Sequence, residues 1–241
     1  MPSSRRRYLA AAGASALAGL AGCSGPDTTS TSPTEGEPAT DTSSTTGTSG
    51  TAPSTDAARF EANLVRDLTD DHPPRFSATL TNVSDEPFTL TCGFAPPLSV
   101  TMMRAAKGDA ELFCYPVDGD ARQHVHGVET DRTNASTTSL PPENRIDGCW
   151  RVTGSFAVNA IAFTRTLAPG ESANVAYDAY TLGRDACFPD GDYRATTEAS
   201  ASAGETAGAS SATWTYGVTL SLRDGSVSGV TASDVTAVTL T

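Results

Sequence analysis

The sequence lacks the short motifs that mark common catalytic sites. It contains no Gly-Xaa-Ser-Xaa-Gly elbow, no phosphate-binding loop and no His-Glu-Xaa-Xaa-His motif. No cysteine has the flanking residues of a thiol nucleophile, and the Cys-Xaa-Xaa-Cys pairs usual in zinc sites are missing. Asp and Glu are so frequent that no two of them stand out as a glycosidase pair. We therefore predict a protein that is not an enzyme and uses no cofactor.

Basic residues are also scarce. Lys107 is the only lysine, and 16 Lys and Arg residues oppose 28 Asp and Glu residues, which gives a formal net charge of -12. A surface with this balance repels phosphate groups. Nucleic acid and anionic lipid headgroups are therefore excluded as expected partners of the folded part.

The apolar run near the N-terminus is too short to span a bilayer. It covers residues 10–20 and follows a basic segment that includes Arg5 and Arg6. A positive segment, an apolar segment and small residues before a cleavage site indicate a signal peptide over residues 1–22. Because Arg5 and Arg6 are followed shortly by Tyr-Leu, the signal is typical of the twin-arginine route, which exports folded proteins.

The signal peptide ends in Leu-Ala-Gly-Cys, which has the form of a lipobox. In a lipobox the cysteine sulfur, here that of Cys23, receives a diacylglyceryl group. Two acyl chains are what stable membrane anchoring requires. We therefore expect the mature protein to begin at a lipid-modified Cys23 on the extracellular face of the cytoplasmic membrane.

The segment after Cys23 has almost no residue that could form a core. From Ser24 to Thr55 it consists mainly of Thr, Ser, Pro, Gly and acidic residues, without an aromatic or large aliphatic side chain. Such a segment cannot bury enough apolar surface to offset its chain entropy. We expect residues 23–56 to be a disordered stalk suited to O-glycosylation, and residues 57–241 to fold.

The folded part is expected to be all-β. Apolar Phe76, Ala78 and Leu80 alternate with polar residues, and no stretch after residue 57 has a helical period. Many short strands separated by turns are typical of an antiparallel β-sandwich. Strands are expected at 59–66, 76–81, 88–92, 98–104, 110–115, 149–153, 156–163, 173–180, 192–198, 212–222 and 226–240.

Two glycines and one polar stretch mark departures from regular strands. Gly191 and Gly225 follow Asp in turn sequences, so both are expected to take a positive φ angle. The polar stretch from about Asp118 to Asn144 does not fit a strand, and we expect it to leave the sandwich.

Four cysteines remain after Cys23, namely Cys92, Cys114, Cys149 and Cys187. An even number in an exported protein indicates two disulfides, for which three pairings are possible. We favour Cys149–Cys187 with Cys92–Cys114. A zinc site made of four thiolates is the alternative.

Other side chains are candidates for modification or binding. Asn82 and Asn134 each begin an N-glycosylation sequon in an expected turn or loop. His124 and His126 alternate around Val125 and would share one face of a strand, which makes them candidates for a surface metal site. We favour an ordinary polar loop over that site. A further set of aromatic residues could line a ligand groove, although core positions are favoured for most of them: Trp150, Trp214, Tyr177, Tyr180 and Tyr193.

Three segments resemble a known family of sandwiches. They are Phe-Ser-Ala-Thr-Leu-Thr-Asn-Val-Ser-Asp-Glu-Pro-Phe-Thr-Leu (76–90), Thr-Leu-Ala-Pro-Gly-Glu-Ser (166–172) and Phe-Pro-Asp-Gly-Asp-Tyr-Arg (188–194). Their order is similar to that of the bacterial intracellular proteinase inhibitor (BsuPI-like) family and of many haloarchaeal lipoproteins. The resemblance implies an immunoglobulin-like fold and, with it, an inhibitor function. The acidic, lysine-poor composition likewise resembles that of proteins from salt-loving archaea.

These observations lead to one expected function and two alternatives. We expect a non-enzymatic surface lipoprotein, attached to the membrane through Cys23, that binds a protein, glycan or solute or supports the cell envelope. An extracellular protease inhibitor is the alternative implied by the family resemblance. A metal-binding lipoprotein that uses His124 and His126 is the third hypothesis.

Overall fold

The computed structural model describes residues 51–128, 140–183, 186–204 and 210–238. Arg5, Arg6, Cys23 and most of the predicted stalk precede this part, and Asn134 falls in one of its gaps. The predictions for these residues therefore lie outside the described residues.

The described chain is almost entirely β-structure. One helical turn and one short 3-10 helix accompany the strands, and the elements in chain order are η1 (Thr55–Ala57), β1 (Ala58–Arg66), β2 (Arg75–Asn82), β3 (Phe88–Cys92), β4 (Met102–Ala105), β5 (Glu111–Pro116), α1 (Gly119–Arg122), β6 (Val125–Val128), β7 (Arg151–Val152), β8 (Ser155–Val158), β9 (Phe163–Leu167), β10 (Ser172–Leu182), β11 (Gly191–Ala203), β12 (Ser211–Arg223), β13 (Ser226–Ala232) and β14 (Thr236–Ala237).

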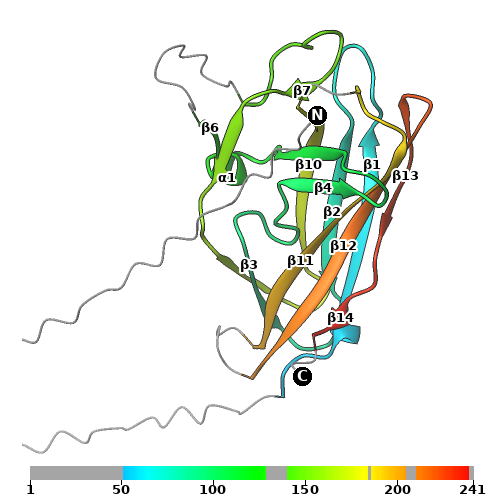
Figure 1. The fold of residues 1–241 in the computed structure, drawn as a ribbon. Helices are drawn as coiled ribbons and strands as arrows, with labels where there is room; N and C mark the ends of the chain where they lie inside the picture. Colours follow the sequence, from blue (N-terminus) through cyan, green and yellow to red (C-terminus); the bar gives the residue numbers. More distant parts are fainter. Residues whose placement is uncertain (1–50, 129–139, 184–185, 205–209, 239–241) are drawn as a thin grey trace, which may run out of the picture. The chain divides into compact units, whose positions relative to one another are not determined.

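Two layers of antiparallel strands enclose the core (Figure 1). In the first layer β1, β2, β10 and β5 pair in that order, and in the second β9, β3, β11, β12 and β13 do so. β4 pairs with both β5 and β11 and thereby joins the layers along one side. The chain changes layer between β2 and β3, crosses back through β4 to β5, returns to the second layer before β9, and changes again between β9 and β10 and between β10 and β11. This is the Greek-key connectivity of immunoglobulin-like sandwiches. The predicted fold class is confirmed.

The smaller strands add to this frame. β7 pairs with β10 in parallel, β14 pairs with β12, and β6 pairs with β8 in a separate two-stranded sheet. The core lies between the inward-facing positions of the two layers. Phe76, Ala78 and Leu80 are buried on β2, as the alternation predicts, and Trp214 and Tyr216 are buried on β12.

A tyrosine fixes the start of β11. The hydroxyl of Tyr193 donates a hydrogen bond to the carbonyl of Pro189, at 2.7 Å. A tyrosine in this place, bonded to the backbone a few residues upstream, is the tyrosine corner of immunoglobulin-like domains. The Pro-Asp-Gly-Asp-Tyr sequence therefore carries a specific local feature of the fold.

One of the two predicted positive-φ glycines is confirmed. Asp224 and Gly225 have φ angles of 52° and 73°, as a two-residue type I′ hairpin turn between β12 and β13 requires. The prediction for Gly191 is wrong, because this residue already belongs to β11 and pairs with Leu222. The backbone reverses earlier, at Phe188, whose φ angle is 44°.

Some predicted strand boundaries also differ. The segment expected at 98–104 contributes only β4, because the main chain at Leu98 and Val100 bonds the hydroxyl of Tyr177 instead of a neighbouring strand. The segment expected at 156–163 is divided between β8 and β9. Within the described part of the polar stretch 118–144, α1 and β6 form.

Candidate ligand-binding groove

The groove arises where two consecutive strands separate. β9 and β10 are joined by the turn at 168–171, in which the amide of Glu171 donates to the carbonyl of Ala168 at 2.9 Å. The two strands belong to opposite layers, and so they diverge from the turn without pairing with each other. Along the described chain β9 pairs only with β3. One flank of the sandwich is therefore open between β9 and β10.

The side of β9 that faces the core is only partly covered. Phe163, Arg165 and Leu167 lie opposite Cys92, Leu90 and Phe88 of β3, which are all buried, so the six side chains share the inner face. Leu167, next to the turn, is fully buried. In contrast, 40% of Phe163 and 47% of the Arg165 side chain are exposed. The core-facing surface of β9 thus becomes a wall of an open groove.

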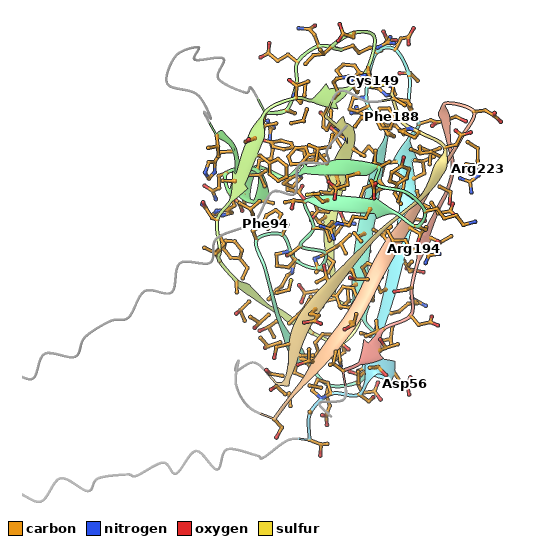
Figure 2. All side chains as sticks on the ribbon, viewed as in Figure 1. Asp56, Phe94, Cys149, Phe188, Arg194 and Arg223 are labelled. Carbon is orange, nitrogen blue, oxygen red and sulfur yellow. A yellow bond between two sulfur atoms is a disulfide. The ribbon has the colours of Figure 1, made fainter. Side chains whose placement is uncertain are left out.

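The groove has an apolar floor and a charged rim. Its volume is about 550 Å³, within the range of small-molecule and peptide pockets. Buried Phe94 and Val175 form part of the lining together with Phe163. Exposed Asp118 and Asp120, at the start of α1, lie along the rim. Figure 2 shows Phe94 on this flank, while Cys149 and Phe188 lie together at one end of the sandwich.

Arg165 closes the end of the groove nearest the turn. Its Nη2 donates to the carbonyl of Ser172 on β10 at 3.3 Å and lies 3.6 Å from Oε1 of Glu171. The guanidinium therefore bridges the two diverging strands. Glu171 already pairs with Arg165, and Asp118 and Asp120 add two further carboxylates to the lining of the groove.

The two predicted histidines lie beside the groove in different roles. The ring of His124 packs against Phe163, with 5.3 Å between the centroids, and its Nδ1 lies 3.3 Å from Nδ2 of Asn159. His124 therefore helps to hold Phe163 in place. His126 is exposed on β6. Within the described ranges no group of three His, Cys, Asp or Glu side chains could hold a metal ion.

One of the two predicted disulfides forms and the other does not. Cys149 and Cys187 are bonded, with 5.6 Å between their Cα atoms. Cys92 and Cys114 are both free and buried, so the predicted Cys92–Cys114 pairing is wrong. The thiol of Cys92, on β3, instead lies within hydrogen-bonding distance of the Pro97 carbonyl and the Ser99 hydroxyl, while Cys114 is on β5 in the opposite layer. Burial raises the pKa of the Cys92 thiol to about 11.

The glycosylation prediction for Asn82 is wrong. This residue is the last of β2 and is fully buried, and its Nδ2 donates to the carbonyls of Glu86 and Leu167 at 2.9 Å each. A glycan would need this same nitrogen at the surface. The sequon hydroxyl of Ser84 donates to Asn82 Oδ1 at 2.7 Å, so the motif closes the turn between β2 and β3.

The aromatic residues singled out from the sequence are core residues, which was the favoured reading. Their exposed fractions are 8% or less: Trp150, Trp214, Tyr177, Tyr180 and Tyr193. The sequence analysis missed the aromatic residues of the groove, Phe94 and Phe163. A usable signal was the spacing of Phe163 and Arg165, because an aromatic and a charged residue two positions apart share one face of a strand.

Among the described residues no helix is long and apolar enough to cross a membrane. Comparisons with protein-family models, with curated proteins and with solved structures found no match to this chain.

Proposed function

We propose that this chain is a lipid-anchored, non-enzymatic protein of the cell surface whose β-sandwich binds a ligand in the groove between β9 and β10. The export signal and the lipobox at Cys23 support the location. The Thr-, Ser-, Pro- and Gly-rich sequence at 24–50 supports a stalk that gives the sandwich reach. An acidic surface suits an external medium rich in salt.

The observation that carries the binding function is the uncovered inner face of β9. A sandwich gains stability by burying this face, and Leu167 shows that the strand does so near the turn. Phe163 lies on the same face and keeps 40% of its surface exposed in the groove that buried Phe94 also lines. Concave sites with apolar walls and a few polar groups are the usual form of ligand sites.

The location is tested by removing the lipid attachment site. Cys23→Ser is expected to release the protein from the membrane fraction and to remove the diacylglyceryl mass from the intact protein. A variant that stays bound to membranes, or a wild-type protein without lipid, contradicts the anchoring.

The binding site is tested with two matched truncations. Phe163→Ala removes the exposed ring of the groove, and Leu64→Ala removes a side chain of similar exposure, 39%, from β1 in the other layer. Arrays of glycans, peptides and small solutes are screened with both variants and with the wild-type protein. Ligands of the groove are expected to bind the wild-type protein and Leu64→Ala but not Phe163→Ala. If no arrayed compound distinguishes the two variants, the groove is not the site.

A second function, inhibition of extracellular proteases, is supported by one braced turn. Ile146 and Cys149 exchange both backbone hydrogen bonds around Asp147 and Gly148, and Cys149 is linked to Cys187. Ile146 is 39% exposed in this turn. A rigid exposed loop is what an inhibitor needs, because ordering the loop in advance lowers the entropic cost of binding. Micromolar inhibition of a secreted protease that is lost in Ile146→Asp supports this function, and the absence of inhibition across a protease panel contradicts it.

A further inference from the structure

The free edge of β9 presents main-chain groups to the groove. The amide of Gly204 donates to the carbonyl of Pro87, and these residues are opposite each other in the β3–β11 register. Along an antiparallel strand, successive residues direct their N–H and C=O groups to opposite neighbouring strands. The main-chain groups of Thr89 and Thr91 therefore bond toward β11. Those of the residues between and beside them, Phe88, Leu90 and Cys92, bond toward β9. Their partners on β9 are Leu167, Arg165 and Phe163. The N–H and C=O groups of Thr164 and Thr166 therefore point away from β3, at the open edge.

The other long edge strands are protected, whereas β9 is not. β1 contains Val65 as an extra residue between its pairs with Phe76 and Arg75, and exposed Arg59 and Glu61 lie along it. β13 contains Ser228 as an extra residue opposite β12. Bulges and charges of this kind prevent another chain from pairing with an edge. β9 has five regular pairs and no bulge or proline, and its one charged residue, Arg165, lies beside Glu171.

The groove lies beside this edge and matches the spacing of an extended chain. Successive side chains of a strand point to opposite faces, so alternate residues of a strand added to β9 would enter the groove on the core-facing side. There they would meet one surface formed by the rings of Phe163 and Phe94 and another formed by the carboxylates of Asp118 and Asp120. The first surface favours an apolar side chain and the second a lysine or arginine.

From this arrangement we infer that the ligand of the groove is an extended polypeptide that adds as a strand to the free edge of β9, with an apolar and a basic side chain in the groove. This inference rests on the proposed binding function and names its ligand class. Main-chain hydrogen bonds to Thr164 and Thr166 supply affinity, and the groove supplies selectivity. The net charge of -12 further favours a basic partner chain.

The test uses a pair of substitutions at one outward-facing residue. Thr164→Pro removes the outward N–H but no bond to β3, and an edge strand tolerates proline at such a position. Thr164→Val keeps the N–H and removes only the hydroxyl, which contacts the Thr91 hydroxyl at 3.2 Å. The full chain is screened against a phage-displayed library of nine-residue peptides. Enriched peptides are synthesised, and their affinity is measured by calorimetry on variants whose circular dichroism matches the wild type.

The inference predicts peptides with apolar and basic residues two positions apart. Thr164→Pro is expected to weaken their affinity about tenfold or more relative to Thr164→Val, because the proline loses a hydrogen bond and displaces the added strand. A second measurement does not depend on how the variant folds. N-methylation of the peptide backbone is expected to abolish binding at alternate residues and to be tolerated at the residues between them.

Three results would overturn the inference. The first is equal binding of the peptides to both Thr164 variants together with tolerance of N-methylation at every position. The second is the absence of any enriched peptide. The third is a glycan or solute that binds in a manner sensitive to Phe163→Ala but not to Thr164→Pro, which would leave the proposed binding function intact. In contrast, if no ligand of any class loses affinity in Phe163→Ala, the proposed binding function itself is contradicted.

Discussion

The Cys149–Cys187 disulfide is expected to contribute strongly to the stability of the sandwich. Cys149 directly precedes Trp150 and β7, and Cys187 lies in the connection between β10 and β11, 38 residues later in the chain. The bond is buried at Cys149, whose sulfur lies 3.6 Å from the hydroxyl of Thr181. The perturbation is the double substitution Cys149→Ser with Cys187→Ser, in a chain that also carries Cys23→Ser.

The magnitude follows from the length of the closed loop. For a separation of 38 residues the chain-entropy model gives a stabilisation of about 4 kcal/mol at 25 °C. For a domain of this size each kcal/mol lowers Tm by roughly 2–4 °C, so the double variant is expected to unfold about 8–16 °C below the parent chain. A loss of this size is a large fraction of the stability of a typical domain.

Thermal unfolding followed by circular dichroism, with and without reductant, measures the effect. Reductant is expected to lower the Tm of the parent chain but not that of the double variant, which serves as the control. After unfolding without reductant, the thiols of Cys92 and Cys114 in the parent chain should react with Ellman's reagent. A double variant as stable as its parent, or an unfolded parent chain without reactive thiols, would refute the reasoning.

Four further predictions concern buried groups. Asn82→Ala is expected to cost about 1–3 kcal/mol, because it leaves the buried Leu167 carbonyl without its donor, and urea denaturation measures this loss. Gly217→Ala is expected to cost about 3 kcal/mol in the same assay, since a Cβ atom would lie 2.3 Å from the Ala195 carbonyl oxygen; a stable variant would show that β11 and β12 can separate locally. Tyr193→Phe is expected to cost about 1 kcal/mol through the lost tyrosine-corner bond, with no change in the circular dichroism spectrum. The pKa of the Cys92 thiol is about 11 in the folded state and near 9 in the unfolded state. The protonated thiol therefore contributes its full stabilisation below pH 9. Its contribution is lost as pH rises from about 9 to 11, by about 1.4 kcal/mol per unit, and Cys92→Ala should reduce that slope in urea titrations at each pH.

The sequence alone was sufficient for the fold class and for several local features. Alternation of apolar and polar residues predicted β2, because a strand with one buried face must repeat every two residues. Asp224-Gly225 predicted its hairpin turn, since both positions need positive φ angles. The spacing of the cysteines was compatible with Cys149–Cys187, which the structure contains.

The features that were predicted wrongly depend on which residues the two layers bring together. Asn82 has the sequon of a surface glycan, yet its amide is needed to bond two carbonyls inside the β2–β3 turn. Cys92 and Cys114 had the even count of a disulfide pair, but both are free, and the Cys92 thiol lies within hydrogen-bonding distance of the Pro97 carbonyl and the Ser99 hydroxyl. Neither outcome could be seen in the local sequence, because each is set by partners distant in the chain or by the path of a loop.

The groove was likewise decided by tertiary structure. The sequence marks Phe163 and Arg165 as strand residues on one face, but only the divergence of β9 and β10 leaves that face uncovered. The outward direction of the Thr164 and Thr166 main chains follows from the registers of β3 with both of its neighbours. What the sequence by itself determined is periodicity and turn chemistry, which are properties of neighbouring residues; the export and lipidation signals at its start are predictions of the same local kind. Pairing, register and exposure are properties of the packed layers, and these placed the candidate site.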